Sequence, residues 1–178
     1  MKKRIILPVI AVILVIAIVC GYRNINQKYP RSVIKLTPKG TEASIQDKIY
    51  ITIEDSRFLS DKEMAEMFKK TEYTPPFEIK ILDITATLEN RSEEIKRADL
   101  TSIYIESPGG GNGISKSMMD VSGGSVGPEL QAGEKKKITI YYEILSTDFK
   151  KRVWKNIENR EFWITYAQYP EKKMLELK

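Results

Sequence analysis

The chain has 178 residues, a formal net charge of +5, no histidine and one cysteine. These absences exclude a disulfide framework, metal sites built on imidazole or paired thiolates, and catalysis by imidazole. Part of the basic charge belongs to Lys2, Lys3 and Arg4; without them the 29 basic residues become 26 against 24 acidic ones. A domain so close to neutral is not expected to bind nucleic acid, and we expect no metal and no cofactor.

The N-terminal segment predicts where the protein resides. An unbroken apolar run from Ile5 to Cys20 follows the basic cluster, and residues 5–22 would span roughly 27 Å as a helix, close to the ~30 Å hydrocarbon layer of a bilayer. We predict that residues 1–22 form a retained signal anchor, with the rest of the chain outside the cytoplasm. A cleaved signal peptide and a lipoprotein signal acylated at Cys20 are the alternatives. The bulky Val19 before Cys20 is unfavourable for lipoprotein processing.

Residues 23–31 are polar and include Pro30, which predicts an irregular stalk, and residues 32–178 are predicted to form one domain. Short strands are expected over 32–36 and 48–54, where apolar and polar residues alternate. Ser60 and Glu63 form a capping box that predicts a helix over 60–70. Its apolar stripe, which includes Met64 and Phe68, indicates a lid docked on the sheets, with a partner-binding helix as the alternative.

Further strands are expected over 77–88 and 100–106. The alternation of apolar residues changes phase at Ile81-Leu82, which predicts a β-bulge or a local twist there. A glycine-rich section follows up to Pro128, and it is expected to be a mobile loop with a short strand near 117–121. The spacing of Lys116 from its glycines does not match a phosphate-binding loop. The residues of this section expected to form a binding loop are Gly109, Gly110, Gly111, Asn112 and Gly113.

The C-terminal third is expected to add a strand over 138–145 and a short helix over 148–156. The lysines Lys135–Lys137 before the strand would protect a sheet edge, with attraction to wall polymers or anionic lipid as the alternative. In the strand over 161–169, Phe162 and Ile164 should face the core, and Trp163 should face outward beneath the helix around Met64 and Phe68. A last short strand is expected over 174–177. The predicted fold is an all-β, immunoglobulin-like antiparallel β-sandwich of about seven or eight strands with one or two short helices, preceded by an N-terminal transmembrane helix.

Two stretches carry a resemblance to known proteins: residues 84–92, ending in Asn90-Arg91-Ser92, and residues 130–138, beginning Leu130-Gln131-Ala132-Gly133-Glu134. They resemble poorly characterised surface proteins of Gram-positive bacteria, in which an anchor or lipoprotein signal precedes one immunoglobulin-like domain. The resemblance implies this architecture and a surface location. It implies no particular activity.

These observations favour a membrane-tethered, non-enzymatic module that binds a protein, a peptide or a cell-wall component. An accessory or regulatory subunit of a membrane complex, such as a transporter or sensor, is the first alternative, and an extracytoplasmic enzyme is the second. Ser32-Val33-Ile34-Lys35 matches the S-x-x-K of penicillin-binding proteins. Because these residues favour a strand, Ser32 and Lys35 would point to opposite faces, and no catalytic residues are expected.

Overall fold

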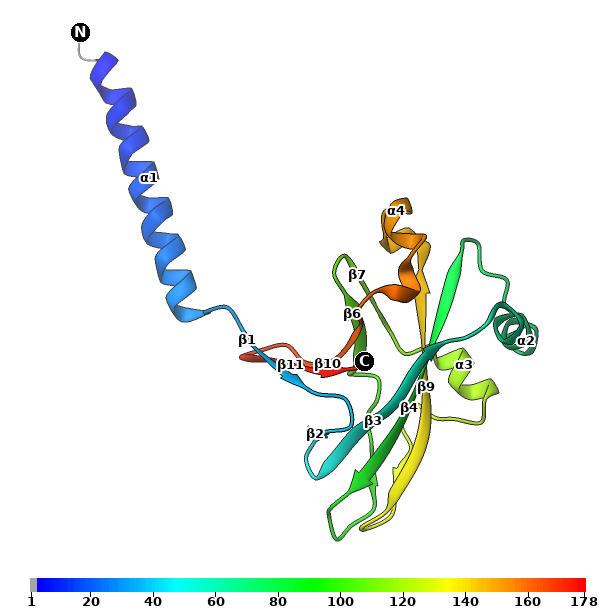
Figure 1. Ribbon diagram of the computed structural model, residues 1–178. Coiled ribbons are helices and arrows are strands. Elements are labelled where there is room, and N and C mark those ends of the chain that lie inside the picture. The colour runs from blue at the N-terminus through cyan, green and yellow to red at the C-terminus, as the bar shows by residue number, and fades with distance from the viewer. Residues whose placement is uncertain (1–2) are drawn as a thin grey trace. The chain divides into compact units, whose positions relative to one another are not determined.

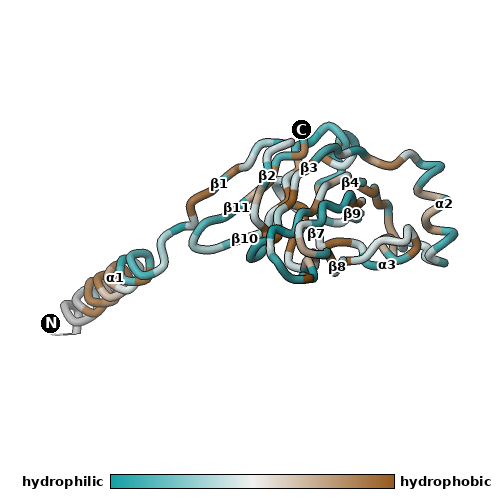
Figure 2. Tube along the Cα trace, turned by 90° about the horizontal axis from the view of Figure 1, so that it is seen from below, coloured by the Kyte–Doolittle hydropathy of each residue, from teal (hydrophilic) through white to brown (hydrophobic). Residues whose placement is uncertain are grey.

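The computed structural model describes residues 3–178. The chain divides into two compact units, Met1–Val33 and Ile34–Lys178. The first unit contains one helix, α1 (Lys3–Lys28), which appears brown over much of its length in Figure 2. Its segment Ile10–Lys28 is long and apolar enough to cross a membrane.

The predicted irregular stalk is wrong for residues 23–28, which belong to α1. These residues contain neither glycine nor proline, so nothing interrupts the propagation of a helix that is already nucleated. Pro30 follows two residues after Lys28 and disfavours helical backbone before it. The linker is therefore shorter than the sequence indicated.

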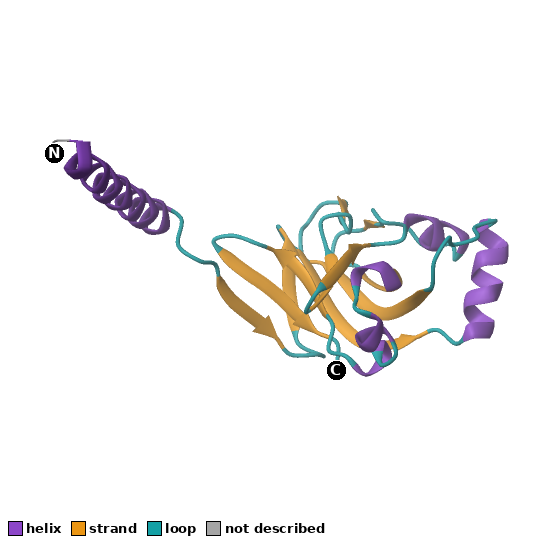
Figure 3. Ribbon diagram, turned by 90° about the horizontal axis from the view of Figure 1, so that it is seen from above, coloured by secondary structure: helices purple, strands orange, loops and turns teal. Residues whose placement is uncertain are grey.

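The second unit consists mainly of antiparallel strands with short helices beside them (Figure 3). One sheet has the order β1-β11-β10-β6-β7, the other has the order β2-β3-β4-β9, and β5 and β8 form a small two-stranded sheet. Figure 1 shows β3, β4 and β9 side by side. The strands are β1 (Val33–Thr37), β2 (Glu42–Gln46), β3 (Ile49–Phe58), β4 (Ile79–Asn90), β5 (Lys96–Arg97), β6 (Tyr104–Ser107), β7 (Gly110–Gly113), β8 (Glu129–Leu130), β9 (Lys135–Leu145), β10 (Trp163–Ala167) and β11 (Glu171–Glu176). The helices of this unit are α2 (Asp61–Thr71), α3 (Lys116–Val121) and α4 (Lys151–Trp154), with 3-10 turns at Ser146–Asp148 and Ile157–Asn159.

One hydrophobic core joins the inner faces of the two larger sheets, and this confirms the β-sandwich. Alternate residues of each strand contribute to it, as the period of two requires. The fully buried members include Ile49, Ile51, Ile84, Leu88, Ile140 and Tyr142 from one sheet and Ile105 and Ile164 from the other.

The helix α2 confirms the predicted lid. Ser60 accepts a hydrogen bond from the backbone N–H of Glu63, and the Glu63 carboxylate accepts one from the backbone N–H of Ser60 at 2.8 Å. Its Met64 packs with Ile81 and with Met118 of α3, in a small second cluster on the outer face of the β2-β3-β4-β9 sheet. This end of the sheet is thus covered on both faces.

The predicted bulge at Ile81-Leu82 is wrong, because both faces of the sheet are covered there and two consecutive apolar residues can both be buried. Both residues are buried, Ile81 in the small cluster beneath α2 and Leu82 in the main core. The register of β4 against β9 runs through them without interruption. The bulge lies instead in the neighbouring strand β3, between Ile53 and Asp55.

Two segments differ from the sequence-based expectation because of local turn chemistry. Asp99 accepts a hydrogen bond from the backbone N–H of Thr101 at 2.9 Å and holds the next residues in a turn, so β6 begins only at Tyr104. Residues 117–121 lie in the helix α3, where an ion pair of 2.7 Å joins Lys116 to Asp120 one turn later.

Asn90 links the two sequence stretches that carry the resemblance. Its side chain is fully buried, and its Nδ2 donates to the backbone carbonyls of Leu130 at 3.1 Å and Gln131 at 3.0 Å. Its Oδ1 accepts from the backbone N–H of Ser92 at 3.0 Å. The Asn-x-Ser pattern is therefore a buried turn, and the asparagine is inaccessible to a glycosylating enzyme.

Candidate functional site

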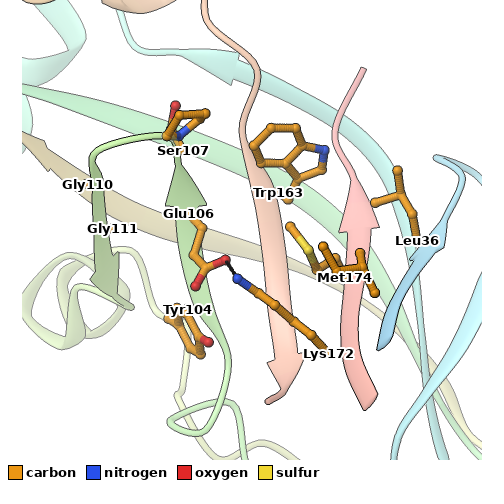
Figure 4. A pocket seen from close by; sticks show the side chains of 11 residues that line it. Leu36, Tyr104, Glu106, Ser107, Gly110, Gly111, Trp163, Lys172 and Met174 are labelled. Atoms are coloured by element: carbon orange, nitrogen blue, oxygen red, sulfur yellow. Dashed lines mark ion pairs between the residues drawn. The ribbon is translucent and has the colours of Figure 1, made fainter. Parts of the chain in front are cut away.

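A groove of about 680 Å³ lies on the outer face of the β1-β11-β10-β6-β7 sheet. It crosses the strands, so every strand of this sheet contributes to its lining (Figure 4). Its lining residues are Ile34, Leu36, Tyr104, Glu106, Ser107, Pro108, Gly110, Gly111, Trp163, Lys172 and Met174.

Strand alternation places Trp163 in the groove. Its neighbours Phe162 and Ile164 are buried in the core, so Trp163 points to the opposite face. Figure 4 shows the Trp163 ring beside the neighbouring strand β11, which carries Met174, with Leu36 on the next strand beyond it. The predicted phase of this strand is therefore confirmed. The predicted cover was wrong, because Met64 and Phe68 pack on the other sheet.

The groove has a polar end. The Glu106 carboxylate forms an ion pair with Lys172 and accepts a hydrogen bond from Thr165 Oγ1 at 3.0 Å. The Tyr104 hydroxyl is buried and has no hydrogen-bond partner among residues 3–178. Burial, and secondarily the negative charge of Glu106, raises the pKa of Tyr104. The Tyr104 hydroxyl is therefore protonated and can donate a hydrogen bond. It lies near the Glu106 carboxylate, whose charge is balanced by Lys172.

Such a lining suits an amphipathic ligand. Trp163, Met174 and Leu36 offer apolar and aromatic surface, while Lys172 and Tyr104 offer donors and Glu106 an acceptor. The Glu106–Lys172 ion pair carries no net charge, so the polar end fits a neutral hydrogen-bonding group better than a strong anion. A groove of this size with few convergent polar groups is typical of ligand sites.

The residues predicted as a mobile binding loop are structured. Gly110–Gly113 form β7, which pairs with β6, and Gly109 occupies the turn with a φ of 100°. A Cβ on Gly111 would lie 2.7 Å from the Ile105 carbonyl oxygen, so close strand packing requires glycine there. Asn112 Nδ2 donates to the Glu143 carbonyl of β9 at 2.9 Å.

Only part of this predicted site reaches the groove. Gly110 and Gly111 line it as backbone, whereas Asn112 ties β7 to β9. The expectation of a mobile loop is therefore wrong for β7. Cys20 lies in α1 and is exposed. Its acylation stays an untested alternative to the predicted retained anchor.

Other sequence motifs contribute no chemistry to the groove. Lys35 of the S-x-x-K stretch lies in β1 and pairs with Glu171 at 2.5 Å. Among the described residues, no three His, Cys, Asp or Glu side chains are arranged to hold a metal ion.

Comparison with known proteins identifies a family for this chain. The profile of one protein family, the domain of unknown function DUF5028, matches residues 39–173. No curated protein matches the sequence.

Several solved structures are similar in fold. An uncharacterised β-sandwich protein from Clostridium difficile has a TM-score of 0.46 at 14% identity, covering 83% of this chain and 97% of that one. A proposed lipoprotein from Bacillus subtilis has a TM-score of 0.49 at 13% identity, covering 78% of this chain but 38% of that one. A secreted protein from Mycobacterium tuberculosis has a TM-score of 0.48 at 11% identity, covering 80% and 96%. With TM-scores below 0.5 at such low identities, these likenesses carry no argument about this chain.

Proposed function

This chain belongs to the DUF5028 family, and we propose that it is a membrane-tethered module that binds an amphipathic ligand outside the cytoplasm without catalysis. The groove on the β1-β11-β10-β6-β7 sheet is the observation that supports this proposal. Its ligand is a peptide, a segment of a protein or a cell-wall component, because each combines apolar groups with neutral hydrogen-bonding groups. The arrangement of the two sheets around one core supports an immunoglobulin-like scaffold for the groove.

The helix α1 supports the proposed tether. Its apolar segment is long enough to span a bilayer, and the three basic residues near the start of the sequence favour the orientation with the domain outside. Glu106, the carboxylate in the groove, supports a role without catalysis. It is already engaged by Lys172 and Thr165, so it is poorly placed to act as a base or nucleophile.

The test uses the full chain in lipid nanodiscs and follows the fluorescence of Trp163 in a Trp154→Phe background. The probes are soluble muropeptides and unstructured peptides, with empty nanodiscs as the blank. A ligand that fills the groove should shift the Trp163 emission to shorter wavelength in a saturable manner, because it removes water from the indole.

A matched pair of variants locates the binding. Ile34 lines the groove and is 65% exposed, whereas Ile95 lies elsewhere and is 61% exposed. Ile34→Ala should weaken binding about tenfold, a loss of about 1.4 kcal/mol. Ile95→Ala should leave it unchanged. Equal effects of the two variants, or no saturable shift with either probe, would contradict the proposal.

A further inference from the structure

The edges of the two large sheets differ in how they are protected. Within residues 3–178, Ile114, directly after β7, forms a bridge with Tyr142 of β9, and β9 begins with three lysines. The edge strand β2 carries Glu42 and Gln46 and has an irregular register near Gln46. Bridges, charges and bulges of this kind hinder pairing with other chains.

The remaining edge strand, β1, carries a single charge and is more apolar than the other edges. Val33 is 63% exposed, Ile34 is 65% exposed and Leu36 is 45% exposed, and Figure 2 shows this stretch in brown. The single charge on the strand, Lys35, pairs with Glu171 of the neighbouring strand β11. The strand order places β11 on one side of β1 and no strand of the described chain on the other.

The chemistry of this edge specifies its occupant. A strand with one neighbour leaves every second backbone N–H and C=O directed outward without a partner. A lipid or a sugar cannot satisfy that repeating row of donors and acceptors in register, but another extended backbone can. Ile34 and Leu36 also line the groove, so a chain beside them would place its alternate side chains at the mouth of the groove.

We propose that β1 binds an extended peptide segment of a partner protein as an additional strand, with an apolar side chain of that segment entering the groove. This inference rests on the proposed function and names the ligand of the same site. The backbone pairing supplies affinity, and the contacts with Ile34 and Leu36 supply selectivity for alternating apolar residues.

The charge on β1 favours a partner over a second copy. If two copies paired antiparallel over all five residues of β1, each Lys35 would lie directly opposite the other. Like charges in that position destabilise a strand pair. A partner segment with apolar residues opposite Ile34 and Leu36 and an acidic residue between them avoids this repulsion. The preferred ligand therefore contains an acidic residue between two apolar residues.

The test uses the full chain in nanodiscs and the probe acetyl-Thr-Val-Glu-Val-Thr-Val-amide. Hydrogen exchange measures the amides of residues 33–37, and those of β2 (Glu42–Gln46) serve as the internal control. Binding should slow exchange in β1 at least tenfold and leave β2 unchanged. A probe N-methylated at alternate residues should bind at least tenfold more weakly, since it loses backbone donors. Replacing its glutamate with lysine should also weaken binding.

Each other outcome overturns the inference. If the probe shifts Trp163 fluorescence but tolerates N-methylation or leaves β1 unprotected, strand addition is wrong although the groove still binds ligand. If the probe does not bind while muropeptides do, the peptide is the wrong ligand class for this groove. If β1 is protected without probe and the chain dimerises as its concentration in detergent rises, the occupant is a second copy.

Discussion

Replacing Asn90 by alanine should destabilise the domain strongly. The side chain is fully buried, and its Nδ2 lies 2.7 to 3.1 Å from the carbonyl oxygens of Glu94, Leu130 and Gln131. The Oδ1 accepts from the backbone N–H of Ser92 and from its hydroxyl. The Nδ2 has two hydrogens, so alanine removes two donated bonds worth about 1 kcal/mol each and leaves a buried carbonyl unsatisfied at about 1–3 kcal/mol. The sum is about 3–5 kcal/mol, a large share of the ~5–15 kcal/mol of a typical domain.

Urea denaturation followed by circular dichroism measures this loss. The control is Asn112→Ala, because Asn112 is half-buried and donates a single bond, to the Glu143 carbonyl. That variant should cost about 1 kcal/mol. If Asn90→Ala costs no more than Asn112→Ala, the reasoning about buried carbonyls is refuted.

The stability of the Asn90→Asp variant should depend on pH. An ionised aspartate only accepts hydrogen bonds, so it would face three carbonyls that need a donor. The fold should therefore favour the protonated acid and raise the pKa of that carboxyl above its unfolded value of ~3.9. Its stability is greatest below the unfolded pKa and falls as pH rises through the folded pKa. Urea midpoints that are independent of pH would contradict this.

Three further predictions concern other elements. Phe162→Ala should cost about 3–5 kcal/mol and Trp163→Ala clearly less, because Phe162 lies in the core and Trp163 faces the groove; the opposite order in denaturant melts would show that the strand phase is wrong. A hydrogen bond from Arg57 is the main cause that lowers the pKa of Glu63 from 4.5 to about 2. The stabilisation from this carboxylate is thus present above pH 4.5 and lost as pH falls toward 2, and an NMR titration of Glu63 with a midpoint near 4.5 would disprove it. Cys20→Ala should leave the protein in the membrane fraction at unchanged mass, and a palmitate label lost in this variant would show that Cys20 is acylated instead.

Periodic signals predicted the long elements well. Ile49, Ile51 and Ile53 alternate in the sequence and are all buried in β3. The capping box of Ser60 and Glu63 marked the start of α2, because it satisfies backbone donors that every helix leaves free. These features depend on residues only a few positions apart, so the sequence shows them directly.

The short elements were predicted poorly because their conformation depends on distant partners. Gly110–Gly113 have almost no side chains to form a pattern, and β7 exists because β6 lies beside it and Asn112 reaches β9. The helix α3 is only six residues long, and burial of its Met118 and Met119 holds it against the sheet. Helices of this length do not persist on propensity alone.

The groove as a whole could not be predicted from the sequence, although the sequence contains one signal of it. Leu36, Glu106, Trp163 and Met174 lie on four strands, of which only β10 and β11 are consecutive in the sequence. Strand order, which periodicity does not determine, brings them together. Yet β10 has apolar residues on both faces, since Trp163 faces outward while Ile164 faces the core. A half-buried strand in a two-layer sandwich should carry polar residues on its outer face. An aromatic residue there therefore indicates a third body over the sheet, and because α2 and α3 cover the other sheet, that body is best sought outside the domain.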